Sequence, residues 1–137
     1  VDLETRTLTH ARAGHCPLMY LPGAAPAATP QVQVLTPNGL VLGLKIDDGT
    51  YFNRLLEEVT LPIGAGDLFV LYTDGITEAV NPEGEWFGEP RLAALLEQHQ
   101  HVPVDELRER ILREIAAFGG DAPQQDDMTM LLLKVDG

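Results

Sequence analysis

Cysteine, basic side chains and long apolar runs are all scarce in this sequence. Its 137 residues include one cysteine, which excludes an internal disulfide and indicates a reducing compartment, in our interpretation the cytoplasm. Lys and Arg number 9 against 21 Asp and Glu, and the formal net charge of −12 argues against a nucleic-acid partner. No segment approaches the ~18 apolar residues of a membrane span, and no signal peptide is visible, so we expect no membrane contact from this segment.

The order of apolar patterns predicts an α+β domain. At 45% hydrophobic residues, the chain is long enough for one core and too short for two. The expected strands are residues 3–13, 18–21, 31–35, 51–60, 68–73 and 128–135, with a Pro- and Ala-rich loop at 22–30. Two helices are expected to begin at Pro90 and Pro103, and Gly119-Gly120 ends the second. Strands, then a helix pair, then a strand is an α+β order.

The apolar run of residues 68–73 stops abruptly at Asp74 and Gly75. Apolar character without polar alternation is typical of a strand buried on both faces. Gly75 permits a sharp or left-handed turn and a close backbone approach. Asp74 would then be held rigidly at the mouth of a strand, which suits a metal ligand. The competing interpretation is a plain Asp-Gly turn, which is the commoner role of this pair.

A second pair of acids, Asp126 and Asp127, precedes the apolar run that closes the chain. Two acid sites at strand edges, far apart in sequence, are what an oxygen-ligand site for magnesium or manganese requires. Taken alone, these two acids would instead be a solvated loop end. His15 and Cys16 invite a zinc or nucleophile interpretation, but neither has a partner at ligand spacing. Asp67 is expected to cap a turn at the entrance of the 68–73 strand.

Several ordered segments resemble the metal-dependent (PPM, protein phosphatase 2C-like) serine/threonine phosphatases of the SpoIIE/RsbU group. The segments are A-R-A-G-H at 11–15, G-L-V-L-G-L at 39–44, G-D at 66–67, L-Y-T-D-G-I-T-E-A at 71–79, G-E-W-F-G at 84–88 and D-D-M-T at 126–129. Each is weak alone, but together and in family order they are specific. Arg12 stands where the group usually has Asn, and Cys16 where it usually has Pro.

The resemblance implies a β-sandwich flanked by helices, with two Mn²⁺ or Mg²⁺ ions at one edge. It implies that Asp74 and Asp126 are catalytic metal ligands and that Asp127 is a ligand or orients waters. Gly75 and Thr73 would support the loop, and Gly14 with His15 would border the site. The implied reaction is hydrolysis of phosphoserine or phosphothreonine by a metal-bridged water, and the implied substrate is a phosphorylated STAS-type anti-anti-sigma protein.

One family element, D-x-x-G-H-G, has no counterpart here, and the chain opens at Val1 without a methionine. In the family this element's aspartate bridges the two metals. We therefore expect residues 1–137 to be the C-terminal part of such a domain, lacking its N-terminal elements and inactive alone. The alternative is a non-catalytic, phosphatase-like module that binds and regulates a partner. A sandwich without all its strands also predicts self-association through an exposed sheet edge.

Overall fold

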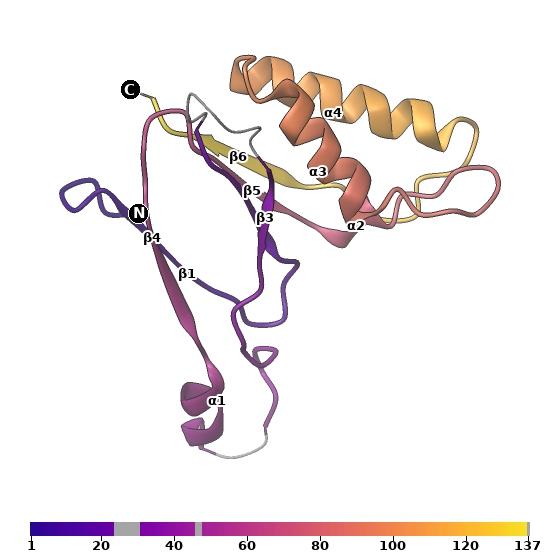
Figure 1. The fold of residues 1–137 in the computed structure, drawn as a ribbon. Helices are drawn as coiled ribbons and strands as arrows, with labels where there is room; N and C mark the ends of the chain where they lie inside the picture. Colours follow the sequence, from indigo (N-terminus) through magenta and orange to yellow (C-terminus); the bar gives the residue numbers. More distant parts are fainter. Residues whose placement is uncertain (24–30, 46–47, 137) are drawn as a thin grey trace.

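The computed structural model describes residues 1–23, 31–45 and 48–136 (Figure 1). The predicted loop at 22–30 therefore lies outside the described residues, apart from Pro22 and Gly23. The elements in chain order are β1 (Thr7–Ala11), β2 (Leu18–Leu21), β3 (Gln33–Leu35), α1 (Thr50–Leu55), β4 (Glu58–Pro62), β5 (Leu68–Tyr72), α2 (Asp74–Thr77), α3 (Gly88–His99), α4 (Val104–Gly119) and β6 (Met130–Lys134).

β5 lies inside a four-stranded antiparallel sheet with the strand order β3-β2-β5-β6. Its apolar run makes this position favourable, because an inner strand of a covered sheet has both faces buried. Phe69 is fully buried and pairs with Tyr20 of β2 and with Leu133 of β6. The antiparallel register between β5 and β6 ends at Tyr72↔Met130, so Asp74 just after β5 and the acid pair just before β6 lie at the same end of the two strands. The prediction of a buried central strand is confirmed.

α3 and α4 cover one face of this sheet (Figure 1). α4 presents an apolar stripe of Leu107, Ile111 and Ile115, which are all buried, as the spacing of three to four residues requires. α3 contributes Leu92 and Leu96 to the same core. Both helices were predicted. Their starts differ slightly: Pro90 is the third residue of α3, and Pro103 caps α4 from outside it.

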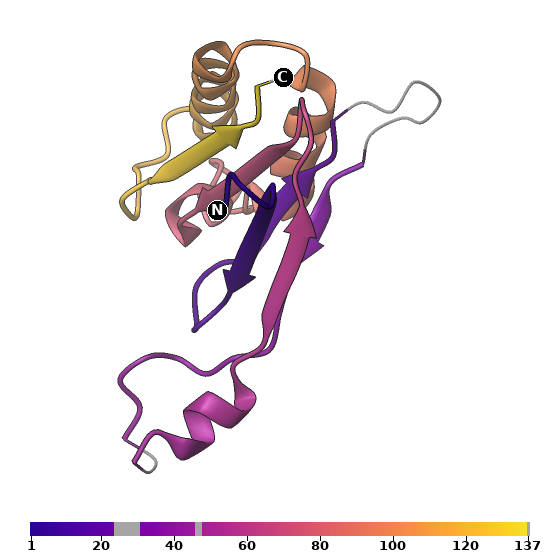
Figure 2. The ribbon, with the colours of Figure 1, turned by 90° about the vertical axis from the view of Figure 1, so that its left-hand side faces the viewer.

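The opposite face of the sheet is covered in part by a two-stranded antiparallel ribbon of β1 and β4 (Figure 2). Leu8 and Ile63 of this region form a second core with Leu18 and Phe69. Two sheets packed face to face, with helices covering the outer face of one of them, give the expected α+β sandwich architecture.

The prediction of a strand over 51–60 is wrong in its first half. Residues 50–55 form the short helix α1, and β4 begins only at Glu58. The carboxylate of Asp48 accepts hydrogen bonds from the backbone N–H (3.2 Å) and hydroxyl (2.6 Å) of Thr50, an arrangement that favours a helix start. α1 buries none of its residues, and it projects away from both sheets (Figures 1 and 2). No helix within the described ranges is long and apolar enough to cross a membrane.

Candidate functional site

Asp74 is positioned by the end of β5 and the start of α2. Thr73 is extended, with φ −94° and ψ 160°, and Asp74 opens the helix. The Glu78 backbone N–H donates to the Asp74 carbonyl at 2.7 Å, which closes this single turn. The Asp74 carboxylate accepts from the Gly75 N–H at 3.1 Å, and its side chain is exposed to solvent. Asp74 thus stands at the mouth of a buried strand, as the sequence predicts, and its carboxylate is open to solvent.

Gly75 lies where the backbone of α2 approaches the loop of Asp126 and Asp127 closely. It is buried, and a Cβ added there would overlap the Asp127 carbonyl oxygen and lie 3.3 Å from the Asp126 carbonyl oxygen. Its φ is not among the positive values found in the chain, so the expected left-handed turn is absent at this described residue. The expected close approach is present. Only glycine allows α2 to touch the loop that holds the second acid pair.

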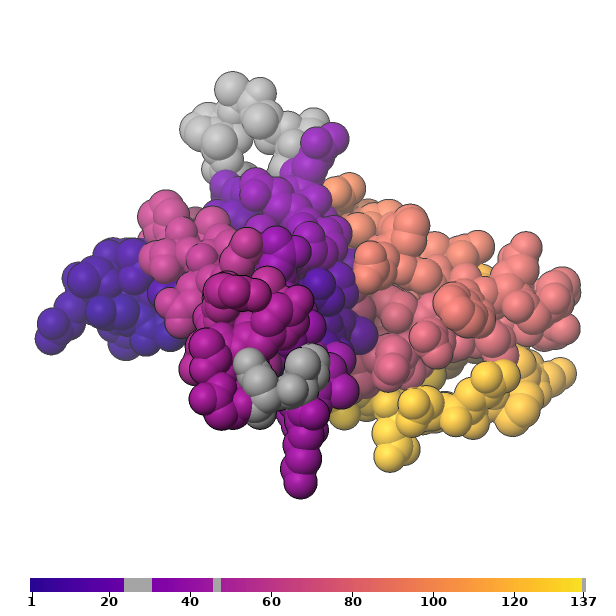
Figure 3. All heavy atoms as spheres, turned by 90° about the horizontal axis from the view of Figure 1, so that it is seen from below, coloured from indigo at the N-terminus to yellow at the C-terminus, as the bar shows by residue number. Residues whose placement is uncertain are grey.

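Thr73 joins the two acid segments through three hydrogen bonds. Its hydroxyl donates to the Asp127 carbonyl at 3.1 Å and accepts from the Thr129 N–H at 3.0 Å. Its own N–H donates to the Thr129 carbonyl at 3.0 Å. We call these three bonds the Thr73 clamp. The clamp extends the β5–β6 pairing and holds the backbone of Asp74 next to that of Asp126 and Asp127. Seen from below, the yellow C-terminal segment lies beside the pink segment that follows β5 (Figure 3).

Asp126 and Asp127 are both exposed in the loop between α4 and β6. The Asp126 carboxylate accepts from the Asp127 N–H at 2.7 Å, and the Gln124 side-chain amide donates to the Asp126 carbonyl at 2.8 Å. In the part of the chain that the structure describes, no salt bridge engages these acids or Asp74. Their carboxylates therefore remain available to a ligand from solvent. Sequence reasoning missed the role of Gln124, because only the folded loop shows which carbonyl its amide reaches.

The surroundings of Asp74 are anionic. The Tyr72 hydroxyl donates a hydrogen bond to the Glu89 carboxylate at 2.9 Å. Burial, and to a smaller extent this hydrogen bond, raises the pKa of Tyr72. Burial and then the charges of Asp74, Glu89 and Glu78 raise the pKa of the Cys16 thiol. A protonated thiol is a poor nucleophile, which agrees with the rejection of cysteine chemistry. A concentration of negative charge around exposed carboxylates attracts divalent cations. Glu89 was not anticipated, and nothing in its sequence position indicated this contact.

The carboxylate oxygens of Asp74, Asp126 and Asp127 are the type of ligand that a hard divalent cation prefers. Mg²⁺ is commonly bound by one or two carboxylates together with waters and substrate phosphates, and the clamped acids supply such oxygens. In number the set is incomplete. Among the described residues, no group of three or more His, Cys, Asp or Glu side chains is arranged to hold a metal. The described residues therefore do not complete a metal site by themselves.

Gly14 and His15 belong to a different contact. Gly14 has φ +83°, and a Cβ there would lie 2.6 Å from Cγ2 of Val41. The carbonyl of His15 accepts from the Arg12 guanidinium at 3.2 Å, so Arg12 braces its own turn. The 11–15 and 39–44 segments therefore pack against each other, and the described contacts of Gly14 and His15 are not with the acids. Asp67 caps its turn as predicted, accepting from the Gly64 N–H at 2.8 Å and the Gly23 N–H at 2.6 Å.

Comparison with known proteins gives a consistent result. The family model of Stage II sporulation protein E (SpoIIE) matches residues 1–136. Phosphoserine phosphatase RsbU of Bacillus subtilis is 29% identical over 134 residues, covering 97% of this chain and 36% of RsbU. Protein IcfG of Synechocystis sp. is 27% identical, covering 96% of this chain and 19% of IcfG. This chain therefore spans about a third or less of these curated relatives.

Solved structures show the same fold. The SiaA-PP2C domain of Pseudomonas aeruginosa superposes with a TM-score of 0.73 at 27% identity, covering 99% of this chain and 49% of that one. The structure of the RsbU and RsbW domains of Rv1364c from Mycobacterium tuberculosis has a TM-score of 0.72 at 21% identity, covering 98% and 34%. The family match, the fold and the clamped acids lead to one conclusion. This chain belongs to the SpoIIE family and represents part of a PP2C-type phosphatase domain.

Proposed function

We propose that this chain contributes to a metal-dependent phosphatase that hydrolyses phosphoserine or phosphothreonine in a regulatory protein. The observation that carries the proposal is the Thr73 clamp, which holds Asp74 beside Asp126 and Asp127 although more than fifty residues separate them. The relationship to RsbU, which is described as a phosphoserine phosphatase, supports the reaction class.

Asp74 and Asp126 would hold the metal, with Asp127 as a further ligand or an orienting group for waters. Carboxylate oxygens suit Mn²⁺ or Mg²⁺, and a pair of such ions, when bound, supplies a nucleophilic water and neutralises phosphoryl charge. The chain's own task is positioning. β5 fixes Asp74, the Thr73 clamp fixes the opposite loop, and Gly75 sets the spacing between them. Gln124 steadies the backbone at Asp126.

We propose that residues 1–137 are the C-terminal part of the domain and that further ligands come from the remainder. This chain covers 49% of the SiaA-PP2C domain and 54% of one structure of the SpoIIE phosphatase domain, and the acids within it are too few for two metals. The chain alone is then expected to be inactive. The incomplete acid set also favours a second candidate, a non-catalytic module that binds and regulates a partner.

The proposed substrate is a phosphorylated STAS-type anti-anti-sigma protein in the cytoplasm. The relationship to RsbU supports this choice. The structure of the RsbU and RsbW domains of Rv1364c, at 21% identity, reports the fold alone and does not bear on the substrate.

The test is hydrolysis of para-nitrophenyl phosphate with manganese, with and without chelator, by the full-length protein that carries this chain. Asp74→Asn and Asp126→Asn each remove one charged metal ligand and should abolish metal-dependent turnover while preserving the fold. Asp121→Asn is the matched control, because Asp121 is an exposed acid in the same α4–β6 connection. Turnover in either site variant equal to that of Asp121→Asn would sink the assignment. Silence of the wild-type protein with manganese would favour the binding module.

A further inference from the structure

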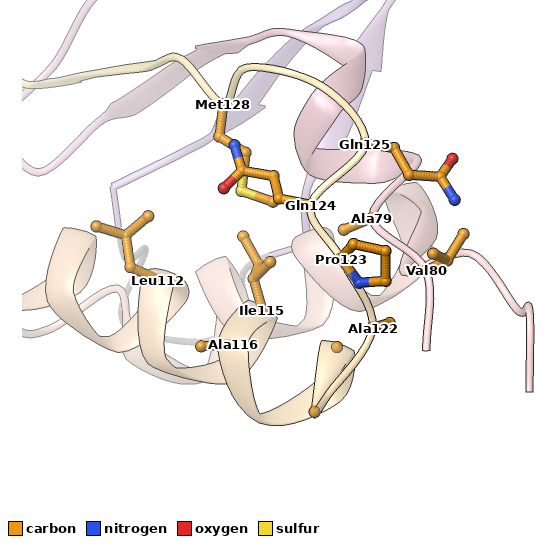
Figure 4. Close-up of a pocket in the computed structure, with 12 residues that line it drawn as sticks. Ala79, Val80, Leu112, Ile115, Ala116, Ala122, Pro123, Gln124, Gln125 and Met128 are labelled. Carbon is orange, nitrogen blue, oxygen red and sulfur yellow. The ribbon is translucent and has the colours of Figure 1, made fainter. Parts of the chain in front are cut away.

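A hollow of about 320 Å³ lies between α4 and the loop that carries Asp126 and Asp127 (Figure 4). Its floor is the α4 helix, through Leu112, Ile115 and Ala116. This volume is at the lower end of the range of ligand sites, about 300–1,000 Å³. It is therefore large enough for one bulky apolar side chain of a partner.

The walls of the hollow continue the two segments that carry the acids. Ala79 and Val80 follow α2, five and six residues after Asp74. Gln125 and Met128 form the other wall and flank Asp126 and Asp127 directly in sequence. Adjacent Cα atoms are about 3.8 Å apart, so the hollow begins within one residue of the acids. A peptide whose phosphate lay over the acids could therefore extend along this loop toward the hollow.

The lining is apolar or neutral throughout. None of the twelve described residues around the hollow carries a charge, although the whole chain contains 21 Asp and Glu. Ile115 is buried at the base, while Leu112 is 40% exposed at the edge. An uncharged recess in an acidic surface favours an apolar group and disfavours an acidic one, which would be desolvated there without a partner.

We propose that this hollow holds an apolar side chain of the phosphoprotein substrate, within about four residues of the phosphorylated residue. An extended peptide advances about 3.3 Å per residue, so such a side chain reaches a site that starts next to Asp126. The inference rests on the proposed phosphatase function and adds a sequence preference to it. It also gives Gln124 a second role, because this residue lines the hollow and donates to the Asp126 carbonyl at 2.8 Å.

The variant that tests the proposal is Ala116→Phe, with Ala117→Phe as its control. Both alanines are exposed on α4, so both substitutions are compatible with the helix and with folding. A phenylalanine at 116 would fill the hollow. Ala117 faces a separate hollow between α3 and α4, lined by Phe87 and Leu95. The pair therefore differs in which recess is blocked.

The probes are phosphoserine peptides of Gly and Ser in which one Leu is moved from four residues before to four residues after the phosphoserine. Binding to the full-length protein is followed by fluorescence anisotropy, and hydrolysis by phosphate release. We expect one Leu position to improve kcat/KM or affinity at least tenfold, and an Asp there to remove the gain. Ala116→Phe should abolish that gain and leave para-nitrophenyl phosphate hydrolysis unchanged, while Ala117→Phe should preserve it.

Three results would overturn the inference. The first is the absence of any Leu position effect, and the second is an equal loss in Ala116→Phe and Ala117→Phe. The third is a loss of para-nitrophenyl phosphate hydrolysis in Ala116→Phe, which would indicate that the protein itself occupies the hollow. If the wild-type protein hydrolyses no phosphate ester, the proposed function fails. The dependence of peptide binding on the Leu position, measured by anisotropy, then still tests whether the hollow binds an apolar side chain.

Discussion

Replacing Gly75 with alanine tests the geometry of the site with a single methyl group. Gly75 follows Asp74 in α2, and its Cα faces the carbonyl groups of Asp126 and Asp127. The new Cβ would overlap the Asp127 carbonyl oxygen, whereas comfortable contacts between such atoms are about 3.5 Å. The two segments must therefore separate by roughly 1 Å, or α2 must turn away from the loop. Either movement displaces Asp74 relative to Asp126.

The effects on stability and on the site should differ in size. Overpacking costs typically ~1–3 kcal/mol, but alanine in place of glycine favours a helix by ~1 kcal/mol. The net loss of unfolding free energy should therefore be small, roughly 0–2 kcal/mol. A 1 Å misplacement of a catalytic group, by contrast, can cost about 100-fold in rate. We expect Gly75→Ala to lose most manganese affinity and turnover while remaining folded.

The assay compares manganese binding by calorimetry, turnover of para-nitrophenyl phosphate and thermal unfolding in the full-length protein. Gly64→Ala is the matched control, because it also adds one methyl group beside β5 but at the end away from the acids. A Cβ at Gly64 would lie 3.9 Å from the Asp67 carboxylate, which is an ordinary contact. If Gly75→Ala bound manganese and turned over substrate as Gly64→Ala does, the close approach would have no role in the site.

Two further predictions concern Cys16 and the edge of the sheet. Burial and the neighbouring carboxylates raise the pKa of Cys16 above its ordinary 9.0, so the folded state holds the thiol proton more strongly than the unfolded state. The stability that this difference contributes is fully present below pH 9.0. It is lost as the pH rises through the folded pKa. Iodoacetamide should then react more slowly with Cys16 in the folded chain than in the urea-unfolded chain at pH 8. Manganese should speed the reaction of the folded chain by neutralising the charge of Asp74. Equal reaction rates in the folded and unfolded chains would contradict the raised pKa. Leu131 and Leu133 on the edge strand β6 are 61% and 38% exposed, so the isolated chain should associate with concentration in sedimentation velocity, and Leu131→Lys should reduce the association. Leu42→Lys is the control: Leu42 is 70% exposed but lies outside the strands, so this substitution should not reduce the association. A chain that stays monodisperse at high concentration would count against the prediction.

The elements predicted correctly are those whose patterns are long or uninterrupted. Five apolar residues in a row determined β5, and the stripe of Leu107, Ile111 and Ile115 determined α4. The errors are at short elements. α1 has six residues and none of them is buried, so its apolar pattern carries no periodic signal. α2 is a four-residue helix that begins at the predicted turn, and its existence depends on packing against a distant loop.

The candidate acids could be identified from the sequence, but their proximity could not. Local pattern placed Asp74 at a strand end and Asp126 with Asp127 before another strand. That the two strands are neighbours depends on pairing across 54 to 56 residues, as the Thr73 contacts show. The family resemblance implied this proximity, and the β5–β6 register provides it physically. The placement of Gly14 and His15 at the border of the site stays a prediction: their described contacts are with the 39–44 segment and Arg12, while the adjacent Cys16 is within range of the charge of Asp74.

The dependence of the site on one strand pair has a thermodynamic consequence. β6 is an edge strand held in the sheet by β5, and Asp126 and Asp127 stand just before it. A slip of one residue would turn the β6 side chains to the opposite face and remove the Thr129 partners of Thr73. A cation bound by Asp74 and Asp126 would bridge the same two segments. Because it binds the paired state alone, it stabilises that pairing by RT ln(1 + [L]/Kd), about 2.7 kcal/mol at a hundredfold excess over Kd. If Asp74 and Asp126 hold the metal as proposed, metal binding and the register of the edge strand would be one equilibrium, and each should report on the other.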